Sequence, residues 1–403
     1  MDPIWDAFLN LLRTALGNPS GPAPELAPEQ WRALCSLAWE HKVLPLIFEP
    51  AYPAAAQADP SLAAGLKRQV RQQVILQTLR TSEFLELYRA LEEAGAAPLV
   101  VKGIVCRRLY PRPDHRPSGD EDLWISPEQF ALCHEAMTRL GLATDEPDPE
   151  AAWEVSYRRS GSPLHIELHK ALFTPGFRTA DTAFNDFFGT PGEGSIMQEV
   201  PGGCVRTMHP TDHLTYLLFH AFKHFLHSGF GIRQICDILL FAHHHSDTVD
   251  WERVRLSCRS IRAEKFAAAV FAIGEKYLGF GPIGPWETQD VDEMPLLEDV
   301  LRAGVYGSAE RSRQHSSTIT LEAASAQKNA KKGVLAAAFP SAKNLEGRYP
   351  WLKKQPWLVP IAWADRMTAY LRETKHRSDS TLADALKIGR ERLELLKRYD
   401  ILN

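Results

Sequence analysis

Two carboxylates two residues apart, Asp120 and Asp122, are the residues of this sequence best suited to metal chemistry. They stand where a glycine-containing loop meets an apolar run that ends at Ile125. Because side chains alternate along a strand, both carboxylates are expected on the same face. Mg²⁺ prefers oxygen ligands and usually takes one or two protein carboxylates together with the phosphates of a substrate. The spacing therefore predicts a site that holds Mg²⁺ against phosphate oxygens.

A third acid follows in an alternating segment in which His165, Glu167 and His169 share one face. If this segment is a strand beside the one that carries Asp122, Glu167 joins the acidic cluster. Three acids around one or two Mg²⁺ ions suit in-line phosphoryl or nucleotidyl transfer, in which the third acid accepts a proton from the attacking hydroxyl. Two alternatives stay open: a solvent-exposed edge strand, or a zinc site made of His165, Glu167 and His169.

The second half of the chain adds a group of cations and one acid. His220, Lys223 and His224 are three or four residues apart and share one expected helix face, and Arg233 and Asp237 share the next. Lys223 is predicted to hold a triphosphate, with Asp237 orienting either Lys223 or Arg233 through an ion pair. Interhelical salt bridges without a catalytic role are the alternative interpretation.

A short basic segment precedes the paired acids and contains Lys102, Arg107, Arg108, Arg112, His115 and Arg116. It predicts an electropositive rim that attracts a triphosphate or another anionic substrate, with a solvated basic surface as the alternative. The chain as a whole has a formal net charge of −4 and a pI near 6.4. These values are not typical of a general nucleic-acid-binding protein.

Length and composition indicate a globular protein of two or three packed units, with 403 residues, 44% hydrophobic and 24% charged. No apolar run is long enough to cross a bilayer, and the first residues lack the basic region of a signal peptide, so a cytoplasmic location is expected. Six dispersed cysteines without a CxxC pair argue against a zinc ribbon or a disulfide framework.

Apolar periodicity predicts the elements that position these residues. In the first 95 residues, helices are expected at Ile4–Leu16, Trp31–Trp39 and within Leu62–Ala94, where Gln77 and Thr81 interrupt the apolar stripe and favour two helices over one. Strands are expected at Pro98–Val101, Asp120–Ile125, Trp153–Arg159 and Leu164–His169, with helices at Ile104–Tyr110 and at Pro127–Leu140, the latter capped by Ser126. Ser160–Pro163 is a hairpin turn between the last two strands.

The segment Phe173–Gly203 reads as a connecting loop with short elements, and helices follow at Thr211–His227, Ile232–His245, Trp251–Ser260 and Ala263–Tyr277. Ser308–Lys332 is polar, and Trp363–Thr374 and Leu382–Tyr399 are predicted to close the chain as helices. The order of elements predicts an α+β fold with a small mixed sheet. We expect an N-terminal helical segment over residues 1–95 packed on an α+β core over 96–207, and a mainly helical domain over 208–403.

Several motifs recur here in a familiar order: Lys102-Gly103, Leu109-Tyr-Pro, Arg116-Pro-Ser-Gly-Asp120-x-Asp122-Leu, His165-x-Glu167-Leu-His and His220-x-x-Lys223-His, followed by Arg233-x-x-x-Asp237. Together they resemble the poorly characterised bacterial nucleotidyltransferase family of the polymerase-β-like superfamily. More distantly, the pattern is similar to that of abortive-infection-type nucleotidyltransferase toxins. The resemblance spans roughly residues 99–240.

The resemblance implies a small mixed sheet on which Asp120, Asp122 and Glu167 bind Mg²⁺, or Mn²⁺, and carry out catalysis. It also implies an NTP, such as ATP, held by Lys102, Gly103, Arg116, Ser118, Lys223, Arg233 and Asp237, and transfer of an NMP to a hydroxyl-bearing acceptor. The net negative charge favours a small molecule or a peptide or protein side chain over tRNA as acceptor, and no membrane partner is expected.

Two of the departures from the superfamily pattern bear on whether the protein is catalytically active. The usual Gly-Ser or Gly-Gly turn is replaced by Lys102-Gly103-Ile104, and Glu121 stands between the two acids, where an apolar residue is usual. These departures motivate a second hypothesis: a catalytically silent nucleotide-binding or scaffold protein with the same fold.

Overall fold

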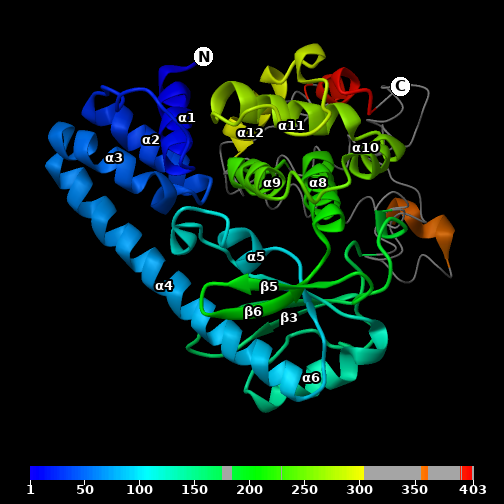
Figure 1. The fold of residues 1–403 in the computed structure, drawn as a ribbon. Coiled ribbons are helices and arrows are strands. Elements are labelled where there is room, and N and C mark those ends of the chain that lie inside the picture. Colours follow the sequence, from blue (N-terminus) through cyan, green and yellow to red (C-terminus); the bar gives the residue numbers. More distant parts are fainter. Residues whose placement is uncertain (175–183, 228, 304–354, 362–390, 392, 402–403) are drawn as a thin grey trace. The chain divides into compact units, whose positions relative to one another are not determined.

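The structure, a computed structural model, describes residues 1–174, 184–227, 229–303, 355–361, 391 and 393–401 (Figure 1). The chain forms two compact units, Met1–Ala221 with Gly231–Val305, and Phe222–Phe230 with Tyr306–Asn403. The segments predicted at Ser308–Lys332 and Trp363–Thr374 lie outside the described residues, as does most of Leu382–Tyr399. The fold described below is that of the first unit, which holds the predicted carboxylates. The three-part division expected from the sequence stays a prediction.

Four helices open the chain: α1 (Pro3–Ala15), α2 (Pro28–Glu40), α3 (Leu44–Ala58) and α4 (Pro60–Glu93). The positions of α1 and α2 confirm the prediction. Helix α3 was missed because Pro50 and Pro53 lie inside it, and proline removes a helical hydrogen bond. Burial of Leu44, Leu46 and Ile47 offsets that loss.

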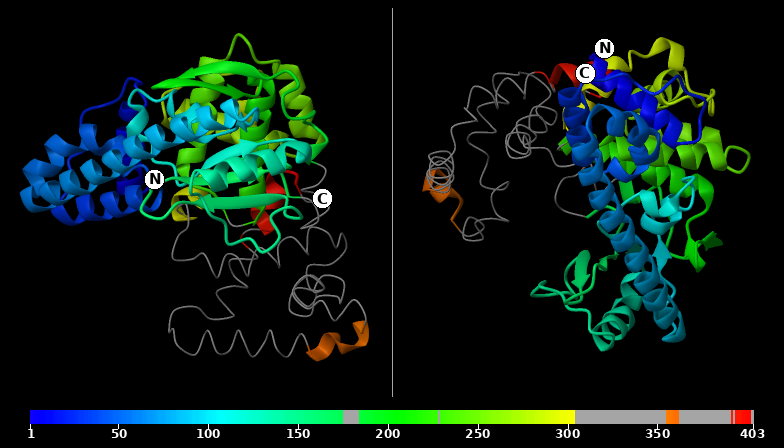
Figure 2. Two further views of the ribbon diagram at one scale, coloured as in Figure 1. Left: turned by 90° about the horizontal axis from the view of Figure 1, so that it is seen from below. Right: turned by 90° about the vertical axis from the view of Figure 1, so that its left-hand side faces the viewer.

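Helix α4 is a single helix of 34 residues, so the preference for two shorter helices was wrong. Gln77 does not interrupt its packing face but is buried within it, and its side-chain oxygen accepts a hydrogen bond from the Ser118 backbone N–H at 2.8 Å. The helix thus satisfies a polar group of the loop that precedes Asp120. In Figures 1 and 2, α4 extends from α3 to α6 along one side of the sheet.

The last turn of α2 is joined to two later helices by His41, which is completely buried. The Ile232 N–H donates to Nδ1 at 3.3 Å, and the protonated Nε2 therefore donates to the Leu301 carbonyl at 3.3 Å. Burial lowers the pKa of His41 from 6.5 to about 4, although the Leu301 bond acts in the opposite direction. The neutral imidazole is thus part of the folded structure.

His41 is expected to make stability fall as the pH drops from about 6.5 to about 4, because in that window the unfolded chain binds a proton that the folded protein excludes. The contribution is on the order of 3 kcal/mol. Urea unfolding at several pH values, compared between the wild type and His41→Gln, measures it. Identical pH dependence in the two proteins would show that His41 does not carry this effect.

A four-stranded mixed sheet follows, in the order β1-β2-β4-β3. Its strands are β1 (Leu99–Val100), β2 (Glu121–Trp124), β3 (Glu154–Arg158) and β4 (His165–His169). Strand β2 pairs in parallel with β4, and the other two pairs are antiparallel. The α+β fold with a small mixed sheet, helices on its flanks and a β3–β4 hairpin is confirmed.

The segments that connect the strands differ from the two helices predicted at Ile104–Tyr110 and Pro127–Leu140. Between β1 and β2 lies the short helix α5 (Gly103–Arg107). After β2, a 3₁₀ turn at Pro127–Gln129 leads directly into α6 (Phe130–Arg139). Ser126 occupies the N-cap position of this turn, as predicted, but its side chain forms no capping hydrogen bond. The rigid φ of Pro127 starts this turn ahead of the helix.

A second hairpin, β5 (Ile196–Val200) with β6 (Gly203–Thr207), lies in and just after the segment predicted as a connecting loop. The turn at Pro201-Gly202 requires glycine, because Gly202 has a φ of +89°. The Thr207 hydroxyl donates to the Val100 carbonyl at 2.5 Å, which joins this hairpin to β1.

The remaining helices are α8 (Pro210–His227), α9 (Ile232–His244), α10 (Trp251–Ser260), α11 (Glu264–Tyr277) and α12 (Met294–Ala303). The four helices predicted from residue 211 to residue 277 are confirmed. Gly274 allows α11 to approach α9 closely, because a Cβ there would lie 2.5 Å from Leu239 Cδ2. Among the described helices, none is both long and apolar enough to cross a membrane.

Candidate active site

Two adjacent parallel strands bring three of the predicted side chains together. Asp122 on β2 is paired in register with Glu167 on β4, as expected from the sequence. One ligand atom each from Asp122, Glu167 and His169 lies within 4.8 Å of the other two. His169 Nε2 is 3.2 Å from Asp122 Oδ1 and 3.8 Å from Glu167 Oε2. His169 was considered only for the zinc alternative, and His165 is not part of this group.

Asp120 is the residue immediately before β2 and is partly exposed. Its charge is one of the causes that raise the pKa of Glu167, so the two carboxylates interact electrostatically. It is not a member of the three-residue group. Its role as a metal ligand stays a prediction.

Lys102 is held against the cluster at the start of α5. Its ammonium nitrogen is 3.0 Å from Asp122 Oδ1 and 3.1 Å from His220 Nε2, on α8. Burial alone lowers the pKa of Lys102, but the Asp122 carboxylate more than offsets this, and the pKa lies well above its ordinary value. Lys102 is therefore a fixed positive charge beside the acids.

The same neighbours keep Asp122 ionised. Burial raises its pKa, but Lys102 and the hydrogen bond from His169 hold it well below its ordinary value. Within the described residues, the second oxygen of this buried carboxylate, Oδ2, has no hydrogen-bond partner. An unsatisfied buried carboxylate oxygen is costly unless a ligand completes it.

Glu167 and His169 have shifted proton affinities as well. Burial, followed by the charges of Asp122 and Asp120, raises the pKa of Glu167 to about 7. Burial lowers the pKa of His169, but the hydrogen bond to Asp122 outweighs it and the net shift is upward. Close carboxylates of this kind favour a bound cation.

The donor set fits a divalent metal ion. Asp122 Oδ2 lacks a partner among the described residues, and Glu167 and the His169 imidazole each offer one ligand atom within 4.8 Å of a ligand atom of Asp122. Carboxylate oxygens suit Mg²⁺, and an imidazole beside them suits Mn²⁺. Asp122, Glu167 and His169 are the residues that would hold the ion.

Metal affinity is expected to fall as the pH drops below about 7, because Glu167 then binds a proton that competes with the ion. Calorimetric titration of Mn²⁺ into the wild type between pH 6 and 8 measures how steeply the affinity changes with pH, which is about tenfold per pH unit for each competing proton. His169, a ligand whose pKa is also raised, contributes a second competing proton. Glu167→Gln should bind Mn²⁺ more weakly and with a shallower slope. Equal slopes would exclude Glu167 as a ligand.

Glu121, the unexpected residue between the acids, belongs to a different network. It is completely buried, and its carboxylate is 2.6 Å from Arg107 Nη1 and accepts the Ile104 N–H at 2.8 Å. The Ser118 hydroxyl also donates to it. Side-chain alternation on β2 directs Glu121 away from Asp122. Glu121 therefore fixes the Lys102-Gly103 turn and is not a further metal ligand of the cluster.

Asp237 does not pair with Arg233, four residues earlier on α9. It accepts two hydrogen bonds from the buried Arg116, and a third from the Tyr110 hydroxyl at 2.7 Å. Arg233 instead donates to the Pro117 carbonyl. The predicted orientation of Arg233 by Asp237 was wrong, because a residue distant in sequence competes for the acid. Lys223 lies in the second compact unit, and its role in binding phosphate stays a prediction.

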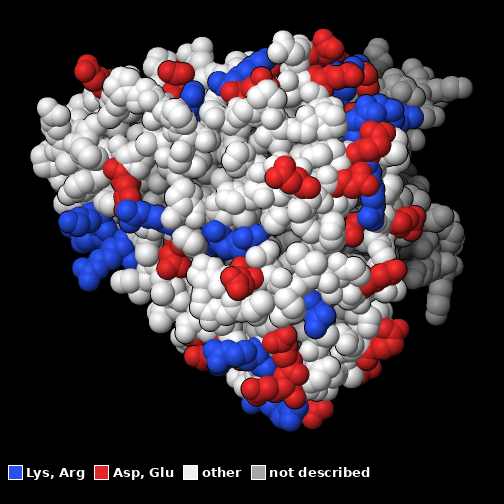
Figure 3. All heavy atoms as spheres, viewed as in Figure 1, with Lys and Arg blue, Asp and Glu red and all other residues white. Residues whose placement is uncertain are grey.

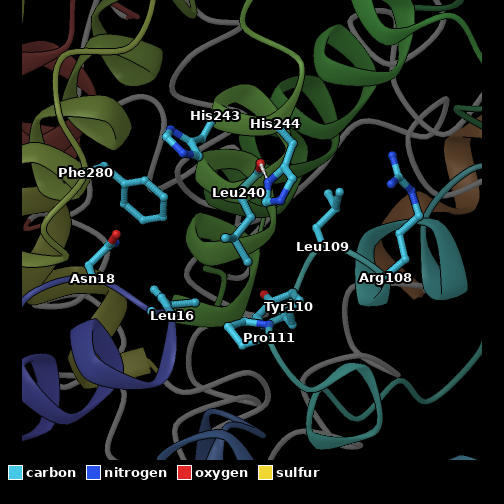
Figure 4. A pocket seen from close by; sticks show the side chains of 11 residues that line it. Leu16, Asn18, Arg108, Leu109, Tyr110, Pro111, Leu240, His243, His244 and Phe280 are labelled. Carbon is cyan, nitrogen blue, oxygen red and sulfur yellow. Dashed lines mark hydrogen bonds between the residues drawn. The ribbon is translucent and has the colours of Figure 1, made fainter. Parts of the chain in front are cut away.

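A cavity of about 490 Å³ lies at the far end of α5, away from the carboxylates (Figure 4). His243 and His244 line it. With the adjacent His245 they point in different directions, because successive residues of a helix are about 100° apart. His243 contacts Phe280, His244 Nδ1 is 2.9 Å from the Leu240 carbonyl oxygen, and His245 Nε2 is 3.0 Å from Arg108 Nη2. The three imidazoles therefore do not form one metal site.

Residues 27–279, more than half of the chain, match the model of a family described as uncharacterised nucleotidyltransferases. The chain belongs to this family. The match includes the sheet, the carboxylates and the helices through α11. No curated protein and no solved structure matches the chain. A nucleotidyltransferase fits the cluster of acids with a fixed lysine described above.

Proposed function

We propose that the protein is a metal-dependent enzyme that transfers an NMP from an NTP to a hydroxyl-bearing acceptor. The observation that carries the proposal is the buried group of Asp122, Glu167 and His169 with Lys102 bound to Asp122. Membership of a nucleotidyltransferase family supports the class of reaction. The metal is Mg²⁺ or Mn²⁺, held by Asp122, Glu167 and His169, with Asp120 as an additional ligand.

In the proposed reaction the acceptor oxygen attacks the α-phosphorus, the bond to the bridging oxygen of the β-phosphate breaks, and pyrophosphate leaves. Glu167, in register beside Asp122, takes the proton of the attacking hydroxyl. Lys102 contributes a permanent positive charge beside the phosphates. Asp122, Glu167 and His169 would hold a divalent ion, whose charge would offset that of the triphosphate. Gly103, Arg116 and Ser118 act in binding by shaping the loops around Lys102 and Asp120.

The acceptor that we favour is a small molecule or a peptide or protein side chain. On the face shown in Figure 3, lysine and arginine side chains are interspersed with aspartate and glutamate, whereas nucleic-acid binding usually relies on a continuous basic surface. Transfer to tRNA would weaken steeply with rising salt. The dependence of the rate on salt therefore tests the class of acceptor.

The direct test is incubation of the protein with Mg²⁺ or Mn²⁺ and each of the four α-labelled NTPs, with and without cell lysate. We expect release of pyrophosphate and label on a lysate component, both lost in Asp120→Ala/Asp122→Ala. Nucleotide binding without label transfer under any of these conditions would contradict the proposal and favour the silent nucleotide-binding protein.

A further inference from the structure

The loop that leads to Asp120 is surrounded by cations, and most of these have a carboxylate partner. Lys102 pairs with Asp122, Arg107 with Glu121, and Arg116 with Asp237. In each pair the acid is buried, so the charge of the cation is balanced by a carboxylate within the protein. Arg107 and Arg116 therefore have reduced capacity to neutralise a further anion, and Lys102 shares its charge with Asp122.

Two arginines at the same loop differ from this pattern. Arg80 of α4 and Arg233 of α9 donate to consecutive backbone carbonyls, those of Ser118 and Pro117. Arg80 also donates to the Pro163 carbonyl at 3.0 Å and to Gln77. Over the described ranges of the chain, no carboxylate forms an ion pair with either guanidinium.

Both side chains are partly buried, and burial lowers the pKa of each. A buried guanidinium is ordinarily compensated by an anion, because its desolvation is costly. Arg233 Nε is buried and has no hydrogen-bond partner among the described residues. Glu121 acts on Arg80 and Asp237 acts on Arg233 without an ion pair to either, and Asp120, the proposed metal ligand, is the acid whose charge acts on both arginines.

Support of the loop alone does not explain these residues. A neutral amide can donate to a carbonyl as a guanidinium does, so a charge is not required for this contact. Gln77, which is neutral, already holds the same loop by accepting the Ser118 N–H. Guanidinium groups are distinguished by charge and by paired donors that match phosphate oxygens. Backbone carbonyls occupy only some of these donors, and Nη2 of each arginine has no hydrogen-bond partner in the portion of the chain that is described.

We infer that Arg80 and Arg233 form a polyphosphate seat beside Asp120, which binds the β- and γ-phosphates of the NTP and then the pyrophosphate that leaves. This inference rests on the proposed function and assigns to Arg80 and Arg233 the neutralising role predicted for Arg116. Arg116 contributes instead by anchoring the loop to Asp237. Helices α4 and α9 thus each bring one arginine to this loop.

The test measures binding of inorganic tripolyphosphate and of pyrophosphate to the full chain by calorimetry in the presence of Mg²⁺. Arg80→Gln and Arg233→Gln keep a neutral donor for the carbonyls and remove the charge. Each should weaken tripolyphosphate binding about tenfold or more, and Arg80→Lys should weaken it less than Arg80→Gln. The matched control is Arg159→Gln, whose arginine pairs with Glu83 at 2.8 Å and is not at the loop; it should bind as the wild type does.

Thermal unfolding of each variant identifies any that fail to fold. If either Arg80→Gln or Arg233→Gln does not fold, the other variant tests the inference. Unchanged tripolyphosphate affinity in a folded Arg80→Gln or Arg233→Gln protein would overturn the inference. Charge-dependent tripolyphosphate binding without label transfer from any NTP would support the seat and contradict the proposed function. Label transfer by a wild type that binds no tripolyphosphate would support the function and contradict the seat.

Discussion

Asp122→Asn is expected to lower the rate of nucleotidyl transfer by about 100- to 1,000-fold. The substitution keeps the shape of the side chain but removes the charge that pairs with Lys102 and accepts from His169. It also replaces one oxygen of a carboxylate whose Oδ2 has no other partner in the described structure. Both metal affinity and the position of Lys102 depend on this residue. Initial rates of label transfer with saturating NTP and metal measure the effect.

The control for this variant is Asp212→Asn, which removes an ion pair with Arg253 outside the cluster and should leave the rate unchanged. Because Asp122→Asn leaves Lys102 buried without its acid, thermal unfolding must accompany the assay. If Asp122→Asn does not fold, Glu167→Gln tests the same cluster with a less buried side chain. Full turnover by a folded Asp122→Asn protein would refute the assignment of the site.

The arrangement of the acids could be predicted because it depends on local patterns. Because side chains alternate along a strand, the sequence shows which face of β2 carries Asp122 and which face of β4 carries Glu167. A hairpin turn before Leu164 marks where β4 begins and makes it available as a neighbour of β2. That these two strands are neighbours was a condition of the prediction, and their parallel pairing in register is a finding of the structure. The same alternation places His169 beside Glu167, which is the signal that could have added it to the cluster.

The charge pairs around the loop could not be predicted, because they join residues far apart in sequence. Asp237 is four residues from Arg233, which is the geometry of a helical ion pair, yet the structure joins it to Arg116, 121 residues away. Helix α3 was missed for a related reason: tertiary burial stabilises a proline-containing segment that local propensity disfavours. Long-range packing decided the outcome in both cases.

Gly103→Ala is expected to destabilise the protein by about 3 kcal/mol or more, the range of the most damaging core substitutions. A Cβ at this position would lie 1.8 Å from Glu121 Oε2 and 2.7 Å from its carboxylate carbon. Glu121 cannot move away without breaking its bonds to Arg107 and to the Ile104 amide, all of which are buried. Gly103 also has a φ of +42°, which alanine adopts at a cost. Chemical denaturation of the wild type and the variant measures the loss.

Gly65→Ala is the matched control, and its expected effect has the opposite sign. Gly65 lies inside α4, has ordinary backbone geometry, and a Cβ there would contact nothing within 4 Å. Alanine should therefore stabilise the helix by about 0.5 to 1 kcal/mol. A Gly103→Ala protein as stable as the wild type would show that Glu121 does not lock the turn. The two substitutions add the same methyl group and differ only in the atoms that it meets. Strong destabilisation by Gly103→Ala together with stabilisation by Gly65→Ala would therefore show that Glu121 holds the turn that carries Lys102 to Asp122.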